Sequence, residues 1–402
     1  MRISTLHSSA DTMRPATELL TKLPSPLKPC QNIRQLLSRL GTAAAKVNGS
    51  LAFMEVCGTH TMSAFRCGLK TVLPENIRLI SGPGCPVCVT AQSDIDLMVG
   101  VAGLANVIIC TYGDMLRVPG RRGTLETARM AGADVRVIYS SLDALAIAQK
   151  EPDREIIFAA VGFETTAPAT AAAILEAHRR GVDNFSVLAS HKRIIPAMRA
   201  LLNAAPTTGL GVDGFMAPGH VSVIIGSRAY EPIVAEYAKS CVIGGFEPQQ
   251  MLSALADLTE LALAGRSALI NQYPEVVRAD GNIAAQKLLA TIFEPCSARW
   301  RGLGAMAESG LAIRTEFSRF DARVRFSLVQ PQESEPRGCL CGQVISGLAE
   351  PGNCKLFGKV CTPINPIGPC MVSSEGTCAA WFKYGCGGGA FAAKSKPQEL
   401  LS

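Results

Sequence analysis

The chain has 402 residues, of which 48% are hydrophobic and 18% charged, and its formal net charge is +6. This length suits two or three domains of ordinary size, and the apolar content excludes an intrinsically disordered chain. The charge is spread thinly, which argues against nucleic-acid binding, and the absence of a long apolar run or a secretory signal predicts a cytoplasmic protein without a membrane span.

The hydrophobic pattern predicts alternating strands and helices. Short runs rich in Val and Ile, without strict alternation, are typical of strands buried on both faces. The predicted strands cover residues 51–56, 77–81, 106–112, 135–139, 155–161, 185–190 and 241–244. Amphipathic stretches predict helices over residues 93–102, 125–131, 168–180 and 248–264. Such alternation indicates an α/β protein with doubly wound parallel sheets.

The same pattern predicts the domain organisation. Two similar α/β domains are expected over residues 30–145 and 146–250, after a flexible N-terminal extension over residues 1–29. Residues 251–402 are expected to form a third domain, helical at first and then rich in cysteine. Seven of the 15 cysteines lie between Cys339 and Cys386. A segment with so little apolar periodicity builds little core, so a metal centre is the natural stabilising element.

The first chemical motif is Met-Glu-Val-Cys-Gly-Thr-His at residues 54–60. Cys57 follows a predicted strand and stands where a helix would begin, and the positive end of a helix dipole favours a thiolate. His60 lies about one turn further on and would supply a hydrogen-bond donor or a proton. The competing interpretation is a buried structural cysteine followed by a capping Thr59, and the spacing leaves both open.

The second motif is Gly-Pro-Gly-Cys-Pro-Val-Cys at residues 82–88. Cys85 and Cys88 form a C-x-x-C pair, which is typical of a metal clamp or a redox dithiol. The sequence has no second C-x-x-C, so a zinc site made from two such knuckles is not expected. A purely structural pair is the remaining alternative.

Several polar turns follow predicted strands. Each is typical of a cap or turn when taken alone, but together they indicate a polar cleft between the two α/β units. Glu164, in the block Gly-Phe-Glu-Thr-Thr, is the candidate site residue among them. The blocks are residues 111–114, 162–166, 190–192 and 218–220.

The third motif lies in the cysteine-rich segment. Cys339, Cys354, Cys361 and Cys378 are separated by 14, 6 and 16 residues, and Cys341 is an alternative to the first of them. Four thiolates suffice for a [4Fe–4S] cluster, whereas zinc ribbons favour tight cysteine pairs that are missing here. The odd number of cysteines in a chain with a large core argues against a secreted disulfide framework.

These blocks together resemble the signature of the HypD family, over about residues 30–385. The resemblance implies two similar α/β domains and a cluster-bearing third domain. It also implies a redox-active scaffold for [NiFe] hydrogenase maturation, on which the Fe(CN)2CO unit is assembled with the chaperone HypC. HypE, with HypF upstream, would deliver cyanide, and the hydrogenase large subunit precursor would receive the product. The matching blocks are residues 54–60, 82–88, 111–120, 162–166, 216–222 and 356–378.

The resemblance also implies residue roles. Cys57 corresponds to the iron ligand, and Cys85 and Cys88 to a redox dithiol facing it. The tail cysteines correspond to the ligands of a [4Fe–4S] cluster, with the choice between Cys339 and Cys341 left open. Two other classes compete with the scaffold. One is a thiol–disulfide or iron–sulfur oxidoreductase acting on a small molecule, and the other is a zinc-stabilised binding module.

Overall fold

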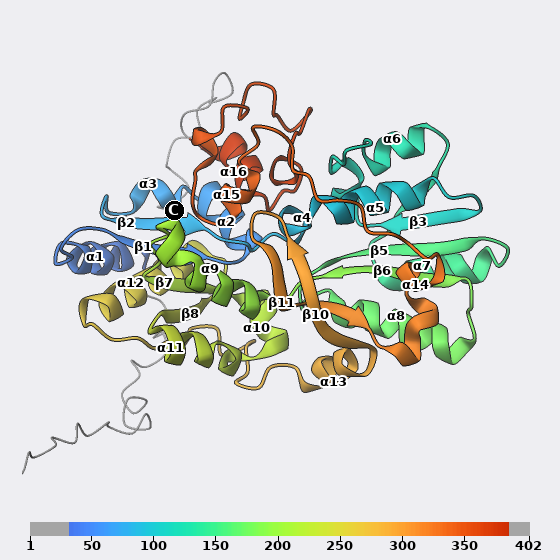
Figure 1. The fold of residues 1–402 in the computed structure, drawn as a ribbon. Coiled ribbons are helices and arrows are strands. Elements are labelled where there is room, and N and C mark those ends of the chain that lie inside the picture. Colours follow the sequence, from blue (N-terminus) through green and yellow to red (C-terminus); the bar gives the residue numbers. More distant parts are fainter. Residues whose placement is uncertain (1–31, 386–402) are drawn as a thin grey trace, which may run out of the picture.

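The computed structural model describes residues 32–385, which contain two parallel sheets and one antiparallel hairpin (Figure 1). The first sheet has the strand order β2 (Ile77–Ser81), β1 (Leu51–Glu55), β7 (Gly214–Pro218), β8 (Ser240–Gly244) and β9 (Leu269–Asn271). The second has the order β4 (Asp134–Val137), β3 (Val107–Thr111), β5 (Glu155–Gly162) and β6 (Phe185–His191). The hairpin pairs β10 (Phe293–Trp300) with β11 (Gly304–Ile313).

Helices cover both faces of each sheet. On the first sheet, α1 (Ile33–Ala44) and α12 (Pro248–Leu263) pack on one face, and α9 (Ile194–Thr208), α10 (Gly219–Ile225) and α11 (Glu231–Tyr237) on the other. On the second sheet, α7 (Ser141–Lys150) and α8 (Ala167–Arg180) pack opposite α5 (Gln92–Ala102) and α6 (Leu125–Met130). This confirms the α/β class and the predicted parallel sheets.

The two sheets share one apolar core. Met54 and Phe215 of the first sheet belong to the same buried cluster as Ile109 and Ile157 of the second. Strand β5 is buried along seven of its eight residues, as its run of Val, Ile and Phe without alternation predicts. The sheets therefore hold their carboxyl-end loops in fixed relative positions.

The strand pairing corrects the predicted grouping into residues 30–145 and 146–250. Strands β1 and β2 pair with β7, β8 and β9, because the chain leaves the first sheet after β2, builds the second, and then returns. Strand β7 had not been predicted, since it begins at Gly214 and ends at Pro218, two residues typical of turns. The hairpin and β9 also replace part of the helical region expected after residue 250.

The cysteine-rich lobe, residues 338–385, packs on the first sheet's loops. It contains α15 (Cys341–Ile345), α16 (Thr377–Tyr384) and the short 3-10 turns η5 (Pro351–Asn353) and η6 (Pro369–Met371). Helix α16 packs against α2 (Gly58–Arg66), as Figure 1 shows. The turn η6 packs against α4 (Pro86–Val89). Contrary to expectation the lobe has apolar anchors, because Val344 and Ile345 are buried in the main core.

The remaining elements are short connections. They are α3 (Leu69–Val72), α13 (Ile283–Ile292), α14 (Ala322–Arg325), η2 (Gly113–Arg117), η3 (Ser227–Tyr230) and η4 (Thr315–Phe320). Within residues 32–385, no helix combines the length and the apolar character that crossing a membrane requires. The predicted N-terminal extension and Cys386 lie outside the described residues.

Candidate functional site

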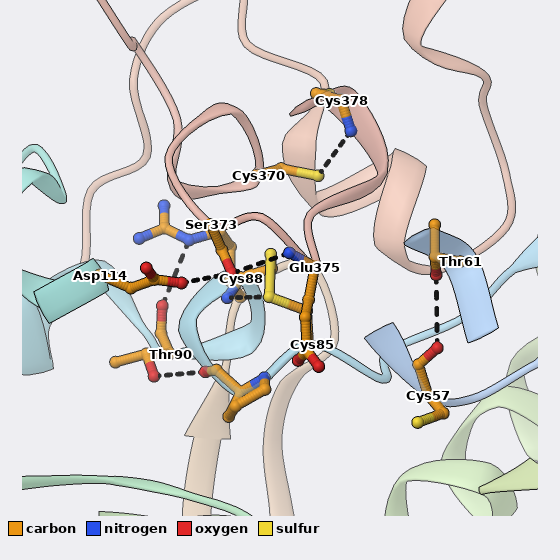
Figure 2. Close-up of a disulfide and its surroundings, with 12 residues drawn as sticks. Cys57, Thr61, Cys85, Cys88, Thr90, Asp114, Cys370, Ser373, Glu375 and Cys378 are labelled. Atoms are coloured by element: carbon orange, nitrogen blue, oxygen red, sulfur yellow. Dashed lines mark hydrogen bonds between the residues drawn. A yellow bond between two sulfur atoms is a disulfide. The ribbon is translucent and has the colours of Figure 1, made fainter. Parts of the chain in front are cut away.

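The Cys57 loop and the C-x-x-C loop touch at the carboxyl edge of the first sheet (Figure 2). Strands β1 and β2 are neighbours, and each is followed by one of these loops. The N–H of Gly58 donates to the carbonyl oxygen of Gly84 at 3.0 Å. A Cβ on Gly84 would lie 2.1 Å from the backbone nitrogen of Cys57, so the approach of the two loops requires glycine there.

Substituting Gly84→Ala is therefore expected to separate the two loops. The added methyl overlaps backbone that has no room to move, and such overpacking costs about 1–3 kcal/mol of unfolding free energy. The matched control is Gly100→Ala in α5, where nothing lies within 4 Å and alanine favours the helix by about 1 kcal/mol. Denaturant unfolding of both variants checks this. Equal stabilities would contradict the close-approach argument.

Cys85 and Cys88 form a disulfide with their Cα atoms 5.2 Å apart. Cys85 is the N-cap of α4, and its sulfur accepts a hydrogen bond from the Cys88 N–H at 3.2 Å. Both residues are buried, and Cys88 is fully so. The structure thus shows the oxidised pair, and cycling between thiol and disulfide stays a prediction.

Cys57 is the N-cap of α2, as predicted, but its thiol is not a ready thiolate. Burial, reinforced by the carboxylate of Glu375, raises the pKa of Cys57 to about 12. Desolvation therefore opposes the preference for a thiolate that the helix dipole was expected to give. The Cys57 N–H donates to Glu55 Oε2 at 3.1 Å, and burial raises the pKa of Glu55 to about 8.

The cysteine-rich lobe closes over Cys57 through Glu375. Thr59 Oγ1 donates to Glu375 Oε1 at 2.7 Å, and a Cβ on Gly58 would lie 2.6 Å from Glu375 Cβ. Thr59 therefore contacts the lobe, and no side-chain cap of α2 is formed. Glu375 was not singled out from the sequence, where its only signal was its place within the matching block 356–378.

The surroundings of His60 do not favour the proton transfer that the sequence suggested for it. It is fully buried, its Nε2 lies 3.0 Å from the carbonyl oxygen of Gly245, and its ring packs on Phe246. Burial lowers the pKa of His60 to about 4, so the ring is neutral near pH 7. These contacts tie α2 to the loop after β8.

Glu164 lies after β5 in the second sheet and caps the start of α9. Its Oε1 accepts the Ile194 N–H at 2.9 Å, while Oε2 is buried without a hydrogen-bond partner among the described residues. Burial raises the pKa of Glu164 to about 7. Glu164 and Cys57 both lie within electrostatic range of the buried Tyr230 hydroxyl, so the two sheets meet near this point.

The lobe's thiols form a connected chain. The thiols of Cys339 and Cys341, of Cys341 and Cys370, and of Cys370 and Cys378 lie close enough to shift one another's pKa. The N–H of Cys378 also donates to the sulfur of Cys370 at 3.2 Å. Cys370 had no assigned role in the sequence, because spacing alone does not separate it from the other tail cysteines.

Cys354 and Cys361 belong to the same lobe, and the Cys361 thiol lies close enough to Cys378 to raise its pKa. The Cys354 thiol donates to the Gly338 carbonyl at 3.7 Å, and the Cys361 sulfur accepts the Ile367 N–H at 3.4 Å. Within residues 32–385, no three His, Cys, Asp or Glu side chains are gathered closely enough to hold a single metal ion. The cysteines of the lobe nevertheless have the chemistry that an iron–sulfur cluster requires, because the ligands of such a cluster are thiolates that accept backbone N–H bonds.

Fold and site together define a class of protein: an α/β protein whose buried thiol and adjacent disulfide are covered by a cysteine-rich lobe. The family model HypD, described as "Hydrogenase formation hypA family", matches residues 31–385. The chain is 47% identical to the hydrogenase maturation factor HypD of Azotobacter vinelandii, covering 88% of this chain and 94% of that protein. The proteins of the same name from Cupriavidus necator and Escherichia coli are 46% and 42% identical, covering 85% and 88% of this chain and 92% and 94% of their own lengths. The chain therefore belongs to the HypD family.

Proposed function

We propose that this protein is a scaffold on which the Fe(CN)2CO unit of [NiFe] hydrogenases is assembled. Iron, the cargo, is held on Cys57 together with a HypC-type chaperone, and HypE delivers cyanide made with HypF. The finished unit then passes to the hydrogenase large subunit precursor. The observation that carries the proposal is one buried thiol, Cys57, on a loop that touches the loop of the Cys85–Cys88 disulfide.

The charges around Cys57 suit a metal cargo. Burial and the carboxylate of Glu375 disfavour a bare thiolate, which keeps the empty site protonated and unreactive. A cation at the sulfur reverses the sign of the Glu375 effect, so the same carboxylate then stabilises the loaded site. Soft thiolate is also the ligand type that suits an electron-rich iron carrying cyanide and carbon monoxide.

The lobe is proposed to hold a [4Fe–4S] cluster on Cys339 or Cys341 with Cys354, Cys361 and Cys378. When bound, such a cluster supplies one-electron transfers. The described residues support a path from the lobe to the disulfide, because η6 carries Cys370 and packs against α4, which carries Cys88. Redox balance at the disulfide requires two electrons and two protons for each conversion to the dithiol.

Infrared spectroscopy of the anaerobically purified complex with the HypC-type chaperone tests the scaffold. Bound cyanide and carbon monoxide absorb where protein does not, so their bands are expected. The second candidate function is a thiol–disulfide or iron–sulfur oxidoreductase acting on a small molecule, which the disulfide itself favours. The burial of this disulfide argues against a bulky reaction partner, since Cys85 is 5% and Cys88 0% exposed. Turnover of a small disulfide without those bands would favour the oxidoreductase.

Thiol labelling tests the redox role of the disulfide. Denatured protein is expected to gain two labelled thiols after chemical reduction, and this gain is expected to vanish in the Cys85→Ser/Cys88→Ser variant. The variant should keep its fold, because the loop is also fixed by the Gly58–Gly84 hydrogen bond. Maturation in cells should stop in the same variant. Normal maturation by the double variant would rule the redox role out.

A further inference from the structure

We propose that a cavity between β2 and the cysteine-rich lobe binds a small oxyanion such as phosphate or sulfate. The cavity has a volume of about 210 Å³. Its walls come from α3 and β2 on the side of the sheet, and from residues 347–351, Thr377 and Trp381 on the side of the lobe. It lies apart from the contact between the Cys57 and Cys85 loops, and none of the tail cysteines lines it.

Lys70 is the first cationic group that would bind an anion in this cavity. Its ammonium lies 4.7 Å from the centre of the Phe65 ring and 5.4 Å from that of Trp381, and it lines the cavity. It forms no hydrogen bond or ion pair with any residue between 32 and 385. Burial lowers the pKa of Lys70, while Glu55 and Glu350 act in the opposite direction. A half-buried ammonium without a polar partner is costly unless a counter-charge reaches it.

Arg78 is the second group. It projects from β2 into the same cavity and forms no ion pair within the described residues. Its charge is close enough to lower the pKa of Lys70. Glu350 is the carboxylate that lines the cavity, and its charge acts on Lys70. Two cations thus face one lining carboxylate, which leaves a net positive site.

Neutral donors complete the site from the lobe. The Asn353 amide oxygen accepts the Glu350 N–H at 2.8 Å, which leaves its NH₂ group without a partner among residues 32–385. Thr377, which carries a hydroxyl, lines the cavity as well. A guanidinium, an ammonium, an amide and a hydroxyl arriving from two walls suit the several acceptor oxygens of a tetrahedral oxyanion. An anion held there would join β2 to the lobe.

Titration of the full-length protein with inorganic phosphate and with sulfate tests the site. Trp381 lines the cavity, whereas Trp300 is buried in the main core, so tryptophan fluorescence reports on binding. A saturable change is expected with either anion and none with chloride at equal ionic strength. Identical responses to chloride and phosphate would overturn the proposal.

Two variants make the test specific. Arg78→Gln changes an exposed side chain, and Lys70→Met keeps the contact with the two rings. Each is expected to weaken anion binding at least about tenfold, as the loss of a hydrogen bond to a charged group typically does. The matched control is Arg66→Gln, an exposed cation on α2 outside the cavity, which should bind as the parent does. Unchanged affinity in both cavity variants would refute the site, whatever the outcome for iron assembly.

Discussion

The Cys57→Ala variant is expected to lose the infrared bands of iron-bound cyanide and carbon monoxide entirely while keeping its fold. Cys57 is the thiol at the junction of β1 and α2, and the other cysteines of this edge, Cys85 and Cys88, are joined to each other. The Cys57 sulfur makes no capping hydrogen bond, so its removal costs folding only the packing of one small group, on the order of 1 kcal/mol. Infrared spectra and iron content of the complex with the HypC-type chaperone measure the first effect, and denaturant unfolding measures the second.

The matched control for this variant is Cys67→Ala. Cys67 caps the other end of α2, is partly buried, and donates its thiol to the Ala64 carbonyl at 3.8 Å. The Cys67→Ala variant also removes one thiol next to α2 but leaves the Cys57 loop unchanged, so the bands should persist. Bands of full intensity in Cys57→Ala would show that another residue carries the iron.

The strands were predictable because of how they are buried. A run such as residues 155–161, apolar on both faces, predicts a strand in a parallel sheet that helices cover on both sides. Strand β5 indeed occupies Glu155–Gly162. The grouping of strands was not predictable, because the pairing of β1 with β7 joins residues about 160 positions apart in the chain. Local pattern says nothing about such contacts, and only the tertiary fold decides them.

The same division holds for the site. The motifs at residues 54–60 and 82–88 predicted two loops at strand ends, and both lie there. Glu375 and Cys370 were not predicted as site residues, because they reach these loops from a lobe that follows much later in the chain, with Glu375 316 residues after Thr59. The place of Cys57 at the start of a helix could be read from the sequence, whereas the raised pKa of its thiol depends on burial, which the spacing left open.

Removing one of the proposed cluster ligands is expected to lower the free energy of unfolding of the cysteine-rich lobe. Cys361→Ala should abolish the visible absorption of the anaerobically purified protein, because four thiolates are needed to hold a [4Fe–4S] cluster. Metal sites in small domains contribute on the order of 10 kcal/mol to folding, and this lobe has few apolar anchors beyond Val344 and Ile345. Proteolysis within residues 338–385 should therefore accelerate at least about tenfold.

Two further cysteine variants decide which thiols hold the cluster. The spacing favours Cys354 and Cys361 as ligands with Cys378, whereas in the structure Cys370 and Cys341 lie near Cys378 as well as Cys361. If the spacing identifies the ligands, Cys370→Ala keeps the iron–sulfur absorption and Cys354→Ala loses it. The reverse result would assign the cluster to the connected chain of thiols. Cys296→Ala, in β10 outside the lobe, is the matched control and should change neither absorption nor proteolysis. A colourless parent protein that contains zinc would exclude both assignments, because zinc has no visible absorption of its own.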